Sequence, residues 1–470
     1  MNIKHNDIVI DPEQPFKNDA LKRENYAKIL SRIISTYADG FVLAINNEWG
    51  TGKTTFVKMW QQQMINDGFQ TLYFNAWEND FEPNPLIALV AELKNLIKPQ
   101  TKEEFKSLLQ KGAVITKNVL PHLVKALAAR YVDTEVLLNA IEDTTKGATE
   151  ILNDEIKEYA AKKNGLKEFR ASLSKFVEAT KGDKPIVFII DELDRCRPNY
   201  AVELLEQVKH FFSVPGIVFV LSIDKVQLGH AVRGVYGNDR IDADEYLRRF
   251  IDIEYSIPNP DTKLFCKYLY NYFDFQLFFF SENRNRHLQF RSDAETIITV
   301  SSSLFEKASL SLRQQEKIFA HVRLGLNFST SNQYIFPSLY LVLIFIKTFY
   351  SDFYINMKLK KLSLEELIKG FYEVIPKGIH VDYSRYFIEV EASLTCMYYN
   401  YTINRASKSL ITKNEVTGEE DSIVKSLIDK SENNGDFVQF IKMFIGSRDY
   451  SDVQIDYLFK KIDLISEVII

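Results

Sequence analysis

Two apolar runs in the first half of the chain lack polar residues at alternate positions. They are "KPIVFIID" (184–191) and "PGIVFVLSID" (215–224). Such runs are typical of central strands in a parallel sheet, because both faces of these strands are covered. The segments "GFVLAI" (40–45) and "FQTLYFNAW" (69–77) predict two further strands.

Helical segments separate these strands. Residues 19–37 carry apolar side chains near helical spacing, and we expect Asp19 to cap this helix. Residues 53–66 predict a second helix, with Phe56 and Trp60 on one side. Strands that alternate with helices predict a doubly wound α/β core built on a parallel sheet.

Helical patterns dominate the rest of the chain. Residues 83–180 are charged and show no strong strand signal, which indicates an insertion within the core. The predicted organisation has five segments: an N-terminal helix with the first half of the core (1–82), the helical insertion (83–180), the second half of the core (181–260), a helical lid-like region (261–350) and a C-terminal helical region of unknown role (351–470).

A glycine-rich stretch lies between the first strand and the helix that follows it. In a phosphate-binding loop, backbone N–H groups surround the β-phosphate, which requires small residues at close approaches. Gly50 and Gly52 would supply that freedom, Lys53 would contact the β- and γ-phosphates, and the Thr54 hydroxyl would bind Mg²⁺. The predicted nucleotide-binding residues are Asn47, Glu48, Trp49, Gly50, Thr51, Gly52, Lys53, Thr54 and Thr55.

Asn47 occupies the position where this loop usually begins with glycine. Asparagine is the residue next best able to adopt a positive φ. We therefore expect Asn47 to replace that glycine with a left-handed backbone. Trp49 and Trp77 are predicted near the same edge of the sheet, where either could pack against the fold or stack on a base.

Two adjacent acids end the apolar run 184–191. Asp191 would hold Mg²⁺ through water, and Glu192 would orient or deprotonate the attacking water. With Lys53 they form the predicted catalytic set, and Thr54 and Asp191 form the predicted metal set. The alternative for Glu192 is that it only caps a turn.

Other polar residues could complete a γ-phosphate site. Ser222 and Asp224 end the run 215–224 and would act as sensors of the phosphate, or only as strand-end caps. Hydrolysis of a γ-phosphate benefits from an arginine supplied by the same or a neighbouring subunit. The candidates are Arg195, Arg197, Arg248, Arg249 and Arg313, each of which could instead form a surface ion pair.

Composition favours a folded protein of a reducing compartment. The chain is 46% hydrophobic and 26% charged, so it is not of a disordered class. Its three cysteines are far apart and form no metal-binding spacing. The N-terminus lacks the apolar run of a signal peptide, and the apolar stretches 335–346 and 112–129 are too short or too interrupted to span a bilayer. We expect a cytoplasmic protein without a transmembrane segment, and a buried helix at 335–346.

Several blocks together resemble the KAP-type P-loop NTPases, within the additional-strand class that includes AAA+ and signal-transducing (STAND) NTPases. In order, they are "NDALKRENYAKIL", "NEWGTGKTT", "FNAW", "DELDRC", "LSIDK", "YLRRFIDIEYSIP" and "SLRQQEKIF", which cover roughly residues 10–330. The glycine loop of this family contains a tryptophan, as here. Many members carry transmembrane helices where this chain has its charged insertion.

The resemblance implies a switch that binds ATP and Mg²⁺ and hydrolyses ATP, with an arginine in the helical segment at Arg313. It also associates the chain with phage exclusion or other bacterial conflict systems, acting by self-association or through an effector protein encoded nearby. One alternative is a regulatory or scaffold subunit that binds nucleotide with little turnover. A less favoured one is a nucleic-acid-stimulated motor, suggested only by the basic cluster Arg284, Arg286, His287 and Arg291 in a segment expected to be exposed.

Overall fold

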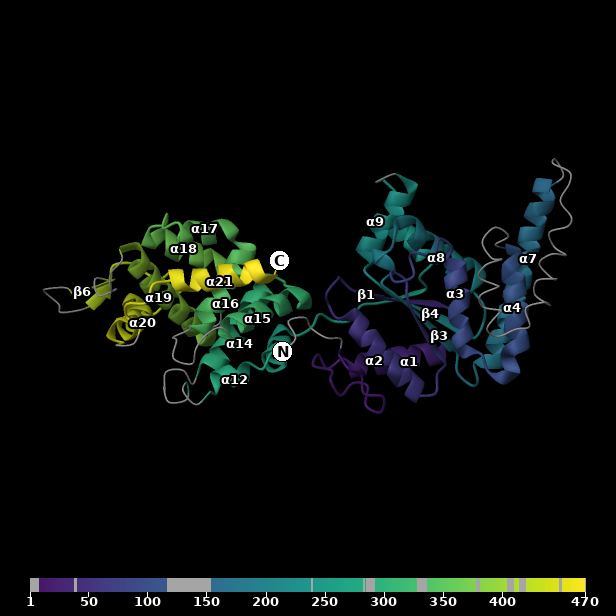
Figure 1. The fold of residues 1–470 in the computed structure, drawn as a ribbon, viewed down its shortest axis with the longest axis horizontal. Helices are drawn as coiled ribbons and strands as arrows, with labels where there is room; N and C mark the ends of the chain where they lie inside the picture. Colours follow the sequence, from purple (N-terminus) through teal and green to yellow (C-terminus); the bar gives the residue numbers. More distant parts are fainter. Residues whose placement is uncertain are drawn as a thin grey trace. The chain divides into compact units, whose positions relative to one another are not determined.

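A computed structural model gives the fold of the chain (Figure 1). It describes residues 8–37, 40–115, 154–237, 240–281, 284, 292–327, 336–377, 381–403, 410–413, 420–447 and 450–469. The chain divides into two compact units, Asp7–Asn259 and Pro260–Ile470. The finer division into five segments made from the sequence stays a prediction.

A five-stranded parallel sheet forms the centre of the first unit. Its order is β2 (Thr71–Asn75), β3 (Ile186–Asp191), β4 (Ile217–Ile223), β1 (Val42–Asn46) and β5 (Ile253–Tyr255). The predicted strands are all present, and every residue of β3 and β4 is buried. The two runs lack alternating polar residues because both faces of these strands are covered, as predicted.

Helices cover both faces of this sheet. One apolar cluster joins Val187 and Ile189 of β3 to α1 (Glu24–Thr36) and α2 (Lys53–Asn66). The other joins Phe188 and its alternate neighbours to the opposite layer of helices. That layer contains α3 (Pro85–Leu93), α8 (Pro198–Phe211), α9 (Lys225–Tyr236) and α10 (Ala243–Arg248).

The first helix begins five residues later than predicted. Asp19 nevertheless acts at its start, because its carboxylate accepts hydrogen bonds from the backbone N–H groups of Leu21 and Glu24, at 3.1 Å each. Lys22 has a positive φ of 55°, so the chain turns there before entering α1. The N-cap of α1 is Arg23, so the predicted boundary at 19 is wrong, and Asp19 supports the start of the helix from the preceding turn.

The described part of the insertion is helical. Two short 3₁₀ turns, η1 (Lys94–Leu96) and η2 (Pro99–Thr101), lead into α4 (Lys102–Ile115). This helix packs along α7 (Asp154–Thr180), where the rings of Phe105 and Phe176 lie 5.6 Å apart. Figure 1 shows α4 and α7 side by side.

The second unit is mainly helical, as predicted. Its one described pair of strands is antiparallel, β6 (Ile411–Lys413) with β7 (Glu420–Ser422). The described helices are α11 (Thr262–Tyr272), α12 (Phe275–Phe279), α14 (Asp293–Lys307), α15 (Leu312–Asn327), α16 (Pro337–Phe349), α17 (Ser351–Lys358), α18 (Leu364–Val374), α19 (Val381–Ile403), η6 (Glu432–Asn434), α20 (Gly435–Gly446) and α21 (Asp456–Ile469).

The apolar stretch at 335–346 forms most of α16. Every residue from Pro337 to Ile346 is buried within its unit, so the prediction of a buried helix is confirmed. In the described parts of the chain, no single helix is long and apolar enough to cross a membrane. By length and composition alone, the bent pair of α16 and α17, at 118° to each other, could do so. Most of the stretch 112–129 lies outside the described residues.

Candidate nucleotide site

The glycine-rich loop joins β1 to α2. Gly50 and Gly52 have φ values of 79° and 81°, which a residue with a Cβ rarely adopts. Gly52 immediately precedes α2, so the helix begins at Lys53 and directs its positive N-terminal end toward the loop. The loop has the strand-before, helix-after context of phosphate-binding loops.

Asn47 does not have the left-handed backbone expected for it. The residues with positive φ include Gly50 and Gly52 but not Asn47. Instead its N–H extends the pairing of β1 by donating to the Ile223 carbonyl at 3.1 Å. Its side-chain amide accepts from the Ile257 N–H at 2.9 Å and donates to the Ile257 carbonyl at 2.6 Å. The expectation was wrong because Asn47 is held as a bridge between the loop and the segment after β5.

Lys53 is buried beneath the loop. Its ammonium donates to the carbonyls of Asn47 and Glu48, the latter at 3.1 Å. Burial lowers the pKa of this ammonium, and the carboxylates of Asp194, Asp224 and Asp191 oppose that change. The loop carbonyls and the carboxylates after β3 and β4 therefore all act on the charge of Lys53.

The carboxyl ends of three neighbouring strands bring polar residues side by side. Asn75 of β2 pairs in register with Asp191 of β3, and Asp191 pairs with Ser222 of β4. A parallel sheet places ligands at this edge. The strand order places β4 directly beside the acidic strand β3.

Asp191 is held by two donors. Its Oδ2 accepts from the Tyr73 hydroxyl at 2.8 Å, and its Oδ1 accepts from the Glu192 N–H at 2.9 Å. These two bonds fix its side chain at the strand end. The residue is buried, with 1% of its surface exposed. Burial raises the pKa of the Tyr73 hydroxyl, and the negative charge of Asp191 raises it further.

Glu192 adopts a left-handed backbone with φ 61°. This conformation is unfavourable for a residue with a Cβ and often occurs at functional sites. Its carboxylate pairs with Arg195 at 2.8 Å and accepts from the Asn75 amide at 3.3 Å. Burial raises the pKa of this carboxyl, and Arg195 opposes the rise. The side chain makes no capping hydrogen bond to the 3₁₀ turn η3 (Leu193–Arg195), so the turn-capping alternative is not supported.

Asp194 is a site residue that the sequence did not single out. Its Oδ2 accepts from the indole N–H of Trp49, which links the acidic segment to the phosphate loop. Burial raises the pKa of Asp194, and the Trp49 hydrogen bond opposes the rise. Trp49 is 45% exposed, and Trp77 is also exposed with the Arg195 guanidinium 5.9 Å above its ring. Neither tryptophan is packed into the core.

The two predicted sensors differ in their surroundings. Asp224 caps α9, because its Oδ1 accepts from the N–H groups of Val226 and Gln227 at 3.1 and 3.2 Å. The Ser222 hydroxyl is fully buried and has no hydrogen-bond partner among the described residues. An unpaired buried hydroxyl is unfavourable, and a bound group with a hydrogen-bond donor or acceptor at the end of β4 would remove that cost.

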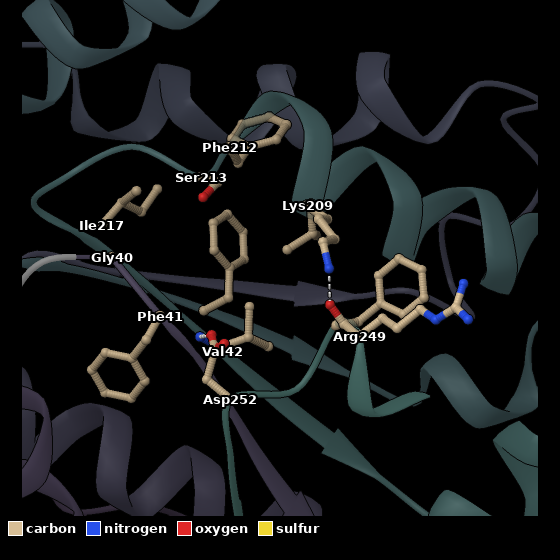
Figure 2. A pocket seen from close by; sticks show the side chains of 12 residues that line it. Gly40, Phe41, Val42, Lys209, Phe212, Ser213, Ile217, Arg249 and Asp252 are labelled. Atoms are coloured by element: carbon tan, nitrogen blue, oxygen red, sulfur yellow. Dashed lines mark hydrogen bonds between the residues drawn. The ribbon is translucent and has the colours of Figure 1, made fainter. Parts of the chain in front are cut away.

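The candidate arginines fall in different places. Arg195 lies at the site, whereas Arg197 is exposed and pairs with Asp80 at 2.8 Å. Arg249 lines a pocket with Gly40, Val42 and Ile217, at the amino-terminal end of the sheet, and its carbonyl accepts from Lys209 (Figure 2). This is the end opposite the phosphate loop. Arg248 is exposed and pairs with Glu245 at 3.2 Å, and Arg313 belongs to the second compact unit.

The basic cluster suggested for nucleic acid is only partly described. Arg286, His287 and Arg291 lie outside the described residues. Arg284 is 4% exposed, forms an ion pair with Asp293 and lies 4.8 Å above the ring of Phe278. The expectation of an exposed basic residue is wrong for Arg284, because its charge is neutralised within its own unit.

The donor set at the carboxyl edge fits Mg²⁺. Asp191 offers a fixed carboxylate, and Thr54 offers a hydroxyl in the first turn of α2. Magnesium prefers oxygen ligands and keeps several waters, so few protein oxygens are needed.

A parallel sheet with a glycine loop before α2 and acids at the end of β3 defines a P-loop NTPase. The model of the KAP family P-loop domain matches residues 23–322, and the chain belongs to this family.

Two known proteins are also similar to this chain. The Phage T7 exclusion protein of Escherichia coli (strain K12) is 21% identical over 257 residues, which cover 51% of this chain and 33% of that protein. The chain therefore matches only a third of the length of this relative. Among solved structures, the ORC2 protein of Aeropyrum pernix (ADPNP–ADP complexes) matches with a TM-score of 0.33 and 13% identity, covering 95% of this chain and 94% of that one.

Proposed function

We propose that this protein is a Mg²⁺-dependent ATPase that works as a molecular switch. The observation that carries the proposal is the backbone of Glu192. Glu192 directly follows Asp191 at the carboxyl end of β3. Its left-handed backbone places its carboxylate beside Asn75 and Arg195. A site that only binds nucleotide needs the first acid, which holds Mg²⁺, more than it needs the second.

The residues would divide the work as follows. The N–H groups of the loop and the Lys53 ammonium bind the phosphates, while Thr54 and Asp191 hold Mg²⁺, which neutralises charge on the β- and γ-phosphates. Glu192 accepts a proton from the attacking water or orients it. Arg195 is close enough to Glu192 to help place that carboxylate or to contact the γ-phosphate. Ser222 would sense the phosphate at the end of β4.

We extend the proposal to phage exclusion, because the chain resembles an exclusion protein over part of its length. In that role, hydrolysis would change self-association or contact with an effector protein. The extension is a proposal for the whole protein and depends on the ATPase.

A second function, nucleotide binding with little turnover, is favoured by one specific observation. The Glu192 carboxylate already pairs with Arg195 and accepts from Asn75. Both carboxylate oxygens are thereby engaged, and the ion pair with Arg195 counteracts the rise in pKa that burial causes, which makes the carboxyl a weaker base. A regulatory subunit would keep Glu192 in this arrangement until a partner releases it.

Phosphate release by the purified protein tests the proposal. We expect slow release with Mg²⁺ and ATP, none with EDTA, and none from Lys53→Ala, because the buried ammonium is lost. Lys28→Ala removes a lysine whose side chain is 62% exposed, and it should behave like the wild type.

The possible outcomes separate the hypotheses. Normal hydrolysis by Lys53→Ala would refute the site. Tight ATP binding without release, with or without partners, would favour the regulatory subunit. Stimulation of release by DNA or RNA would support a nucleic-acid motor.

A further inference from the structure

Arg23 is a buried arginine that the sequence did not place at the site. It lies just before α1, and only 4% of its surface is exposed. Burial lowers the pKa of its guanidinium, and Asp19 opposes that change. Burying a guanidinium is unfavourable unless its N–H groups find acceptors, so its position requires a reason.

One end of this guanidinium contacts the phosphate loop. Its Nη1 donates to the carbonyl of Thr51 at 2.9 Å, across 28 residues of sequence. A trans peptide is planar and its C=O and N–H point in opposite directions. The Thr51 carbonyl faces Arg23, so the N–H of Gly52 must point away from it, to the other side of the peptide.

This peptide needs an external support. Gly52 has φ 81° and no Cβ, and a glycine can populate alternative backbone conformations readily. If the peptide between Thr51 and Gly52 rotated, a carbonyl oxygen would replace an N–H donor beside the bound phosphates. A phosphate loop depends on inward-pointing N–H groups, so that rotation would weaken binding.

The other end of the guanidinium makes no compensating contact with the described residues. Its Nη2 is buried and has no hydrogen-bond partner among the described residues. A buried charged donor without an acceptor is costly, so this position is unfavourable for an arginine whose only role is packing.

We propose that Arg23 is a positioning residue for nucleotide binding, which fixes the Thr51–Gly52 peptide with the Gly52 N–H available to phosphate. The inference rests on the proposed nucleotide site. Arg23 acts through the loop backbone.

Packing of α1 does not depend on Arg23 alone. Ala27, Leu30 and Ile34 of this helix are fully buried against the sheet layer. The Trp60 indole of α2 also donates to the Ser31 hydroxyl at 2.9 Å. Figure 1 shows α1 and α2 together on one side of the sheet. Loss of Arg23 should therefore weaken nucleotide binding more than it weakens the fold.

Calorimetric titration with Mg-ADP tests this inference in a matched pair of variants. Arg23→Ala should lose roughly tenfold or more in affinity, the scale of a lost charge-assisted hydrogen bond. Arg32→Ala removes an exposed arginine from the same helix and should bind as the wild type does. Arg23→Lys keeps a charged donor and should recover part of the affinity. Melting without nucleotide should be similar in all of them, whereas the stabilisation by Mg-ADP should fall only at position 23.

If Arg23→Ala does not fold, Arg23→Gln replaces it, because it removes the charge while keeping a polar side chain. A folded Arg23→Ala or Arg23→Gln with wild-type affinity overturns the inference. Equal losses of affinity in Arg23→Ala and Arg32→Ala also overturn it. Absence of Mg-ADP and Mg-ATP binding in the wild type instead refutes the proposed function.

Discussion

The two compact units use buried charge in different ways. In the unit Asp7–Asn259, Lys53, Asp191 and Asp224 converge near one end of the sheet, and Arg23 contacts the loop there. In the unit Pro260–Ile470, Arg323 donates to the Phe273 carbonyl at 2.6 Å. The charges of the first unit come from several elements and gather at one edge of a sheet, whereas Arg323 of α15 contacts the end of α11.

Glu391 and Asp429 illustrate the second pattern. The Ser426 hydroxyl donates to Glu391, and Asp429 accepts from the N–H of Phe437 at 2.8 Å. The first contact connects α19 to the segment that precedes α20, and the second connects that segment to α20 itself. Burial alone therefore does not identify a functional charge. Convergence at the carboxyl edge of a parallel sheet is a better guide, because ligands bind at that edge in open α/β sheets.

The largest effect should follow from Glu192→Gln. If the carboxylate handles the proton of the attacking water, turnover should fall by about 10²-fold or more, with little change in ATP affinity. Single-turnover phosphate release and calorimetry measure the two quantities. Glu203→Gln, an exposed position on α8, is the control. Wild-type turnover in Glu192→Gln would show that Glu192 does not take the proton of the attacking water.

Gly325→Ala should destabilise the second unit without affecting the site. A Cβ at Gly325 would lie 2.2 Å from the hydroxyl oxygen of the buried Tyr340. Such overpacking costs about 1–3 kcal/mol of unfolding free energy. Gly446→Ala is the matched control, because nothing lies within 4 Å of its added Cβ. Chemical denaturation measures stability, and unchanged ADP affinity would confirm that the effect stays within the structural unit.

The carboxyl of Glu391 should make the second unit less stable as pH rises. Burial raises its pKa to about 8, while Ser426 opposes the rise. Between its ordinary value of 4.5 and about 8, the folded state holds a proton that the unfolded state has released. The unfolding free energy then falls with increasing pH, by up to about 1.4 kcal/mol per unit for one proton. Glu391→Gln should flatten this slope in urea unfolding measured at pH 6 and pH 8, and an unchanged slope would contradict the assignment.

The smallest effect should come from Asn47→Ala. It removes both amide hydrogen bonds to Ile257, each of which contributes about 1 kcal/mol. We expect a modest loss of stability together with weaker Mg-ADP binding, because the loop loses its connection to the segment after β5. Asn95→Ala, at an exposed position, should be neutral. A neutral Asn47→Ala would mean that the bridge does not support the loop.

The sequence predicted those features that depend on neighbouring residues. The apolar runs predicted β3 and β4, and the glycines of the loop have the positive φ that their pattern requires. Asn47 was interpreted wrongly because its partner, Ile257, lies 210 residues later.

Tyr73, Asn75, Asp194 and Arg23 were not assigned to the site for the same reason. Their contacts join strands, loops and helices that meet only in the folded sheet. The place of Arg249 likewise depends on the direction of the strands, which no local pattern records.

The placement of the tryptophans makes intrinsic fluorescence a probe of one unit. The chain has three tryptophans, at positions 49, 60 and 77, and all of them belong to the unit Asp7–Asn259. Trp60 is buried, whereas Trp49 is partly exposed and bound to a carboxylate at the edge of the site. Tryptophan emission therefore reports on one unit alone, while far-ultraviolet circular dichroism reports on both. Comparison of the two signals during denaturation separates the unfolding of the nucleotide unit from that of the helical unit, without any added label.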